Sequence, residues 1–210
     1  MIKLETHPSN NPLTGQSKWW GEPDMPEDLD YPELVVTDDD GESWQDPLTF
    51  VCQIRCEELA AFDPEGLLPH EGMLYFFAAL DYFLGDIEAP SYPGMGLWQS
   101  LHFRVLYAPS IENLHTHHIV NADGSLATLP AETVSFSKCD EADDGIRLLG
   151  PPYIEEVREE NPQKISLLQI DESDRWGLTF HDCGMLNFLI SPSDLLVRRW
   201  EKVSCYLFSF

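Results

Sequence analysis

The chain alternates between short apolar runs and segments rich in proline, glycine and aspartate. Each apolar run has the length of a buried or half-buried strand, and flanking turn residues separate it from the next run. None approaches the roughly 18 uninterrupted apolar residues of a membrane helix. The pattern therefore predicts a mostly antiparallel sheet. The expected strands are 47–54, 72–80, 101–107, 164–171, 184–190 and 203–210, with a hairpin between 115–120 and 125–129.

Short helices are expected between some of these strands. Residues 56–62 have helical character and end at a Pro- and Gly-containing turn, and a proline opens a second segment at 152–160. A third helix begins after Ser191, which suits the N-cap position, while Asp194 lies favourably near the positive end of the helix dipole. Together with the strands, these segments favour the α+β class.

Two parts of the chain carry the same short pattern. A glutamine inside an apolar strand, Gln53 or Gln169, is followed at similar spacing by the phrase Gly-Met-Leu-x-Phe, at 72–76 and at 184–188. The shared order indicates an ancient duplication. We therefore expect two pseudo-repeated β(α)β halves that form one compact unit. Both glutamines should be buried, with each amide bonded to nearby backbone or lining a cleft between the halves.

The N-terminal part is rich in Pro, Asn, Asp and Gly and reads as an irregular arm with one short strand at 34–36. Its adjacent tryptophans, Trp19 and Trp20, should fix the arm to the core. We expect a single domain over 1–210. Its parts are the acidic arm 1–46, a first repeat 47–107, a connecting region 108–163 and a second repeat 164–210.

Negative charge is the most unusual bulk property. Lys and Arg number 12 against 37 Asp and Glu, for a formal net charge of −25. Such a surface repels nucleic acid and anionic membranes and attracts a basic protein, although solubility alone also explains it. No Lys or Arg occurs from Trp19 to Ile54. The expected partner-binding acidic surface comprises Asp38, Asp39, Asp40 and Glu42.

The five cysteines are odd in number, and the N-terminus has no apolar signal segment. This combination indicates reduced thiols in a cytoplasmic protein.

The chain lacks a Gly-rich phosphate loop, a nucleophile elbow and a His-Glu-x-x-His motif. His181 and Cys183 lie two residues apart and suggest either a thiol with its base or two metal ligands. No second pair at zinc spacing accompanies them, so we favour ordinary residues there. We predict no catalytic residues, no metal and no cofactor.

Several short phrases nevertheless occur together in a fixed order. They include Ser17-Lys18-Trp19-Trp20-Gly21-x-Pro23, Pro47-Leu48-x-Phe50-x-x-Gln53-Ile54, Gly72-x-Leu74-x-Phe76-Phe77, Arg104-Val105-Leu106-Tyr107, Leu148-Leu149-Gly150-x-Pro152 and Gly184-x-Leu186-x-Phe188. On these phrases the chain resembles the YwqG-like family, a bacterial family of unknown function. The resemblance implies a mixed α+β fold and supplies no catalytic residues.

Two functions remain open. The charge and the missing catalytic constellation favour a non-catalytic protein that engages a basic partner, for example an inhibitor or an immunity protein against a cationic toxin. The alternative is an enzyme or small-ligand binder with a cleft between the repeats. Its polar contacts would be Gln53, Gln169, Arg104 and Lys18.

Overall fold

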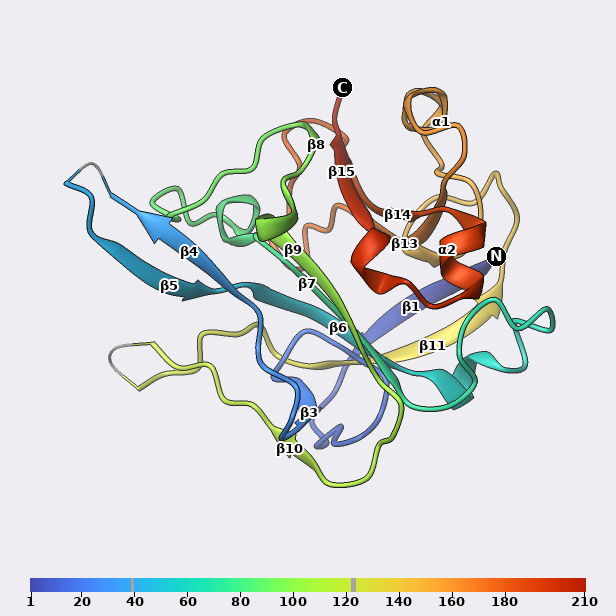
Figure 1. Ribbon diagram of the computed structural model, residues 1–210, viewed down its shortest axis with the longest axis horizontal. Helices are drawn as coiled ribbons and strands as arrows, with labels where there is room; N and C mark the ends of the chain where they lie inside the picture. The colour runs from blue at the N-terminus through green and yellow to red at the C-terminus, as the bar shows by residue number, and fades with distance from the viewer. Residues whose placement is uncertain (39, 122–123) are drawn as a thin grey trace.

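A computed structural model describes residues 1–38, 40–121 and 124–210 (Figure 1). Eleven strands among these residues form one sheet, in which every neighbouring pair is antiparallel. Its strands, in spatial order, are β8 (Gly96–Leu97), β15 (Ser204–Phe208), β14 (Met185–Ile190), β13 (Ile165–Asp171), β12 (Arg147–Leu148), β1 (Ile2–Pro8), β11 (Glu132–Lys138), β2 (Lys18–Trp19), β6 (Thr49–Arg55), β7 (Met73–Ala78) and β9 (Phe103–Ala108).

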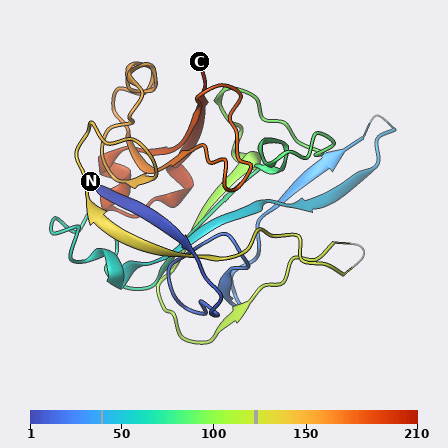
Figure 2. The same cartoon turned by 180° about the vertical axis from the view of Figure 1, so that it is seen from behind.

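Two small sheets and several short helices complete the chain. Strand β3 (Asp24–Pro26) pairs with β10 (Leu114–Thr116), and β4 (Glu33–Thr37) pairs with β5 (Ser43–Pro47) in a hairpin that extends away from the main sheet (Figure 1, Figure 2). The helices are α1 (Glu155–Glu160), α2 (Pro192–Leu196) and the 3-10 helices η1 (Cys56–Leu59), η2 (Asp81–Leu84), η3 (Ser100–His102) and η4 (Trp200–Lys202).

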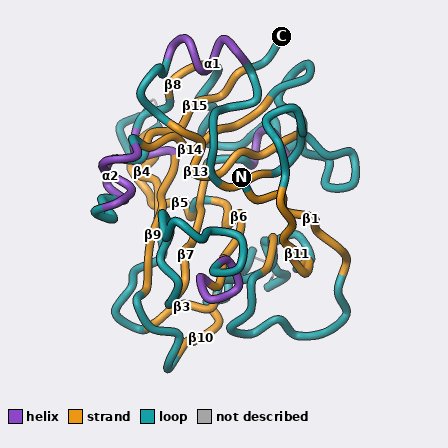
Figure 3. Tube along the Cα trace, turned by 90° about the vertical axis from the view of Figure 1, so that its right-hand side faces the viewer, coloured by secondary structure: helices purple, strands orange, loops and turns teal. Residues whose placement is uncertain are grey.

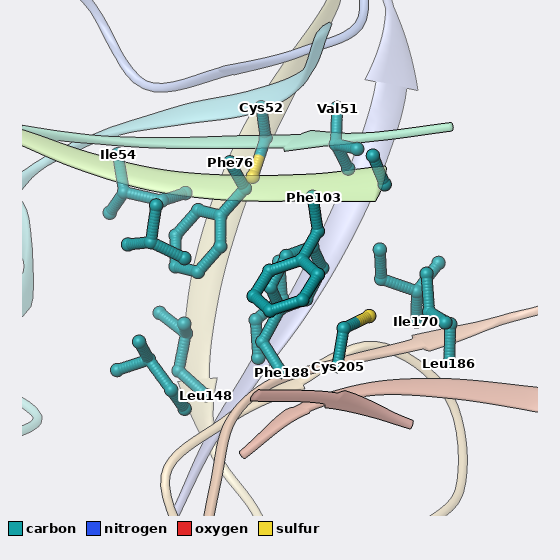
Figure 4. Close-up of a cluster of buried hydrophobic side chains, with 14 of the residues drawn as sticks. Val51, Cys52, Ile54, Phe76, Phe103, Leu148, Ile170, Leu186, Phe188 and Cys205 are labelled. Carbon is teal, nitrogen blue, oxygen red and sulfur yellow. The ribbon is translucent and has the colours of Figure 1, made fainter. Parts of the chain in front are cut away.

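The large sheet curls around its own hydrophobic core. The rings of Phe76 on β7 and Phe188 on β14 lie 5.3 Å apart, although six strands separate β7 from β14 in the sheet. Phe103 on β9 also contacts Phe188, at 6.2 Å between ring centroids. Figure 4 shows side chains from the two sides of this curl, such as Ile54 and Leu186, in the same cluster. Burial of this shared apolar surface stabilises the curl.

Continuous apolar runs form where a strand is covered on both faces. On β7, Leu74 and Phe76 enter the main core, whereas Tyr75 and Phe77 enter a second cluster beneath the N-terminal segment. On β14, Leu189 lies in a third cluster that includes Val157 of α1, although Leu189 belongs to the same strand as core residues. Because both faces are buried, these strands show no alternation of polar and apolar residues.

The predicted α+β fold of two β(α)β halves is wrong. Strands of both expected repeats belong to one curled antiparallel sheet, in which β12, β1, β11 and β2 join them. The two α-helices found among the described residues have six and five residues and lie on the outside (Figure 3). The short helices expected at 56–62 and 152–160 occur in part, as the 3-10 helix η1 and as α1. Apolar contact across the curl, rather than helix packing, closes the core.

The N-terminal segment was expected to be irregular, but it forms several strands. It contains β1 to β4 and most of β5, and β1 is a central strand of the large sheet, paired with β11 and β12. Ile2, Leu4 and Thr6 of β1 are buried, whereas Glu5 and His7 are exposed. This period-two pattern is typical of a strand and was obscured by the many turn residues that follow it.

Several local predictions are confirmed. Ser191 caps α2 by accepting a hydrogen bond from the N–H of Asp194 at 3.1 Å. Trp19 and Trp20 are 0% and 1% exposed and contact the ring of Trp176, so they fix their segment to the core. Helix α2 buries Leu195, whereas Leu196 is 61% exposed.

Steric constraints explain the glycine that opens each Gly-Met-Leu-x-Phe phrase. A Cβ on Gly72 would lie 2.2 Å from the carbonyl oxygen of Ala108. One on Gly184 would lie 2.4 and 2.5 Å from Cβ and the carbonyl oxygen of Phe180, and 2.9 Å from the carbonyl oxygen of Phe208. In both places the backbone that enters a strand passes close to the end of the neighbouring strand. The likeness concerns these two strand pairs and does not divide the sheet into halves.

Replacing Gly72 with alanine should destabilise the protein more than replacing Gly66. Both glycines have positive φ, +78° and +65°, but a Cβ on Gly66 meets no atom within 4 Å. Left-handed strain of about 1–2 kcal/mol therefore affects both variants, and only Gly72→Ala adds an overpacking cost of about 1–3 kcal/mol. Urea unfolding measures the difference, and equal losses would contradict the steric explanation.

Candidate functional site

Lys18 and Gln53, two of the predicted ligand contacts, meet at a buried carboxylate. Oδ2 of Asp24 accepts hydrogen bonds from Lys18 Nζ at 2.8 Å and from Gln53 Nε2 at 2.9 Å. It also accepts one from the N–H of Gly15, and its Oδ1 accepts one from Thr116 Oγ1. Burial alone would raise the pKa of Asp24, but the hydrogen bonds, led by that from Lys18, lower it. We interpret this cluster as structural because partners in the chain occupy its groups.

The third residue, Gln169, lies in a separate polar cluster. Its Oε1 accepts hydrogen bonds from Arg147 Nη2 at 3.2 Å and from the N–H of Tyr153 at 2.9 Å, while its Nε2 donates to the carbonyl of Gly145. Like Gln53, it is 0% exposed. The prediction that both glutamines are buried is confirmed, and each amide bonds to backbone of a distant loop.

Arg104, the fourth residue, is exposed on β9 at one edge of the large sheet. Lys18 and Gln53 therefore share one cluster and Gln169 lies in another, whereas Arg104 is exposed on β9, which β7 separates from the strand of Gln53. The structure does not bring the four side chains around a common cleft.

His181 and Cys183 lie in the loop before β14. Nε2 of His181 is 2.9 Å from the hydroxyl of Tyr92, and the exposed Cys183 is near Asp182, with Sγ 3.7 Å from Oδ1. The negative charge of Asp182 raises the pKa of the Cys183 thiol, which disfavours the nucleophilic thiolate. Within the described ranges, no three His, Cys, Asp or Glu side chains are arranged to hold a metal ion.

The predicted acidic surface lies at the tip of the β4–β5 hairpin. Asp38, Asp40 and Glu42 are exposed there, and Asp38 Oδ1 accepts the N–H groups of Asp40 and Glu42 at 3.0 and 2.8 Å. Asp39 lies outside the described residues. The hairpin holds these carboxylates away from the body of the protein (Figure 2).

A pocket of about 570 Å³ lies at the base of this hairpin. We call it the Asp81 pocket. It is lined by the end of β5, by η2 and the loop after it, and by residues 119–121 and 126–129. Trp20 also lines it, and the buried indole N–H of Trp20 has no hydrogen-bond partner among the described residues. Leu48 and Leu129 contribute apolar surface, so the pocket combines apolar walls with polar groups, as binding sites do.

Three carboxylates give the pocket a strong negative potential. Burial raises the pKa of Asp46, and the charges of Asp81 and Asp86 raise it further. Burial also raises the pKa of Asp81, although Thr49 Oγ1 donates a hydrogen bond to its Oδ1 at 2.6 Å, and Asp86 adds to the increase. Among the described residues, no Lys, Arg or His forms an ion pair with these three. A cation would therefore relieve their mutual repulsion.

Large apolar side chains are exposed on the same elements. Val35 and Trp44 on the hairpin are 63% and 43% exposed, and Ile87 in the loop after η2 is 81% exposed. Val120 and Leu126, each 57% exposed, line the pocket itself. We call Trp44, Ile87, Val120 and Leu126 the apolar rim. Val35 is not part of it, because Val35 lies opposite Gln45 in the register and therefore faces the other side of the hairpin from Trp44. Apolar surface beside a polar depression is typical of protein-binding sites.

The family model described as "Domain of unknown function (DUF1963)" matches residues 17–207. The chain belongs to the DUF1963 family. No curated protein matches it. The matched range includes every segment that lines the Asp81 pocket, so the pocket lies within the DUF1963 domain. Among its described residues, no helix has the length and hydropathy that crossing a bilayer requires.

Sequence reasoning missed most of this site. Asp46 belongs to the acidic N-terminal window, but Asp81 and Asp86 come from a separate segment. The available signal for the site was that Asp81 and Asp86 flank the apolar turn at 82–85. Only the folded DUF1963 domain shows that all three line one pocket.

Asp81→Asn should stabilise the DUF1963 protein near neutral pH, because the amide keeps an acceptor for Thr49 and removes a repelled charge. The folded-state pKa of Asp81 is raised, so ionised Asp81 destabilises the folded protein. This destabilisation is absent below the unfolded-state pKa and grows as pH rises through the folded-state pKa. We expect a thermal midpoint about 2–4 °C higher at neutral pH, as about 1 kcal/mol produces in a domain of this size. The difference should vanish near about pH 4.

The control is Glu65→Gln, which removes one exposed charge without disturbing a described contact and separates local repulsion from net charge. A lower midpoint for Asp81→Asn at neutral pH, or a difference that does not vary with pH, would contradict this view of the pocket.

Proposed function

We propose that this DUF1963 protein is a non-catalytic binding protein that engages a basic protein partner at the Asp81 pocket and the apolar rim. The observation that carries this proposal is a combination of two features: three carboxylates that have no ion-pair partner among the described residues, and exposed apolar side chains on the same elements. A lysine or arginine side chain would enter the pocket, while apolar groups of the partner would cover Trp44, Val120 and Leu126.

Net charge and local charge have different roles in this proposal. The net charge of −25 attracts a basic partner over a distance and speeds encounter. Exposed charges are screened at physiological salt, where the Debye length is about 8 Å. The half-buried Asp46 and Asp81 are screened less. High salt should therefore slow association more than it accelerates dissociation.

Binding of a cation is coupled to proton release. Because the pKa values of Asp46 and Asp81 are raised in the free protein, a bound cation would lower both and favour ionisation. Affinity should therefore rise with pH through the raised pKa values and become constant above them.

We further assign the chain to the YwqG-like group on its matching phrases, and we infer a cytoplasmic location because all five cysteines are free. An inhibitor or an immunity protein against a cationic bacterial toxin has the properties proposed here. The small-ligand alternative has less support, because groups of the chain occupy the amides of Gln53 and Gln169.

A charge-matched pair of variants tests the proposal. Asp46→Asn/Asp81→Asn/Asp86→Asn removes the pocket charges, and Glu65→Gln/Glu71→Gln/Glu112→Gln removes the same number of exposed charges elsewhere. Each protein is immobilised and exposed to lysate of its source organism at low and high salt. We expect the wild type and the surface variant to retain a basic protein, and the pocket variant to retain at least about tenfold less. Equal recovery by both triple variants would exclude the Asp81 pocket as the binding site.

A further inference from the structure

Strand β5 has an unpaired outer edge. Among the described residues it pairs with β4 alone. The hydrogen bond from the N–H of Asp38 to the carbonyl of Glu42, with the register of the hairpin, places the ladder bonds at the pairs 36/44 and 34/46. The N–H groups of Ser43 and Gln45 therefore point outward. Pro47, which has no N–H, occupies the next outward position.

This outer edge opens onto the Asp81 pocket. Asp46 and Pro47 of β5 line the pocket together with residues 119–121 and 126–129, whereas no residue of β4 does. Strand β4 instead lies against η3. In Figure 1 and Figure 2, β5 lies between β4 and the chain at 115–121 and 124–129, which agrees with this placement.

Negative charge is the main protection of this edge. Exposed edge strands usually carry lysine, internal proline or a bulge, which prevent pairing with another chain. The hairpin strands contain no Lys or Arg, their only proline is the last residue of β5, and their register is regular. Their charged side chains, Glu33 and Asp46, repel a second copy of this acidic chain and attract a basic strand.

We propose that the basic partner binds as an extended segment, adding a third strand along the outer edge of β5 and placing one Lys or Arg side chain in the Asp81 pocket. This inference rests on the proposed function and adds the mode of binding. Backbone hydrogen bonds to Ser43 and Gln45 would provide affinity, while the pocket would select a basic side chain at one position of the strand. Trp44 and Val120 would cover the apolar residues of the segment.

A peptide probe separates backbone pairing from charge attraction. A short peptide in which lysine and threonine alternate has the charge and the extended preference that the edge requires. Two further versions are N-methylated on the lysines or on the threonines, which keeps the charge and removes one set of N–H donors. Binding is measured by isothermal titration at low salt. We expect the parent to bind and at least one methylated version to bind about tenfold more weakly, because several backbone hydrogen bonds are lost.

The protein offers a matched pair of variants for the same titration. Gln45→Pro removes an outward N–H from β5, and Val35→Pro makes the same change directly opposite, on β4. Neither N–H takes part in the hairpin ladder, and circular dichroism checks that both variants fold. Gln45→Pro should weaken the parent peptide at least about fivefold, whereas Val35→Pro should leave its affinity unchanged.

The outcomes distinguish the two proposals. If no peptide binds, the proposed function is wrong, and strand addition with it. If all three peptides bind equally to the wild type, a basic partner is still supported, but strand addition is excluded. A larger effect of Val35→Pro than of Gln45→Pro would place the partner on the other edge and overturn the inference.

Discussion

The buried carboxylate of Asp24 holds together the segments on which the candidate site depends. Its side chain binds Lys18 on β2, Gln53 on β6 and Thr116 on β10, and its carbonyl accepts the hydroxyl of Tyr75 on β7 at 2.7 Å. Strand β10 leads into the residues that form one wall of the Asp81 pocket. Breaking one partner of a buried ion pair costs about 3–5 kcal/mol, so this anchor is strong.

Aspartates with opposite surroundings have different roles in this protein: one stabilises the fold, and the others favour binding of a cation. Asp24 accepts hydrogen bonds from the ammonium of Lys18, the N–H of Gly15 and the amide of Gln53, and these lower its pKa despite complete burial. Asp46 and Asp81 have one another and Asp86 as charged neighbours, and their pKa values are raised. A folded domain gains nothing from uncompensated carboxylates, but a binding site does, because the repulsion is relieved when a cation arrives.

Local chemistry was readable from the sequence, whereas closure of the sheet was not. The Ser191 cap, the buried Trp19 and Trp20 and the paired strands each follow from residues close in sequence or from strong apolar runs. The contact between Phe76 and Phe188 depends on how far the sheet curls, which no local pattern encodes. Interpreting the two strand pairs as β(α)β halves was wrong, because both pairs belong to one sheet. It also hid β1, whose alternating residues complete the sheet. The Asp81 pocket was hidden because its carboxylates come from segments that meet only through the pairing of β6 with β7, in which Thr49 lies opposite Ala78.

The acidity of the hairpin then has a physical reason beyond solubility. An open edge strand risks pairing with another copy of the same chain. Lysine on this edge would prevent that pairing, but it would also repel a basic partner. Acidic residues repel another copy while leaving the edge open to a segment of opposite charge. For a protein that carries −25 overall, charge of this sign is the one form of edge protection that is compatible with the partner proposed here.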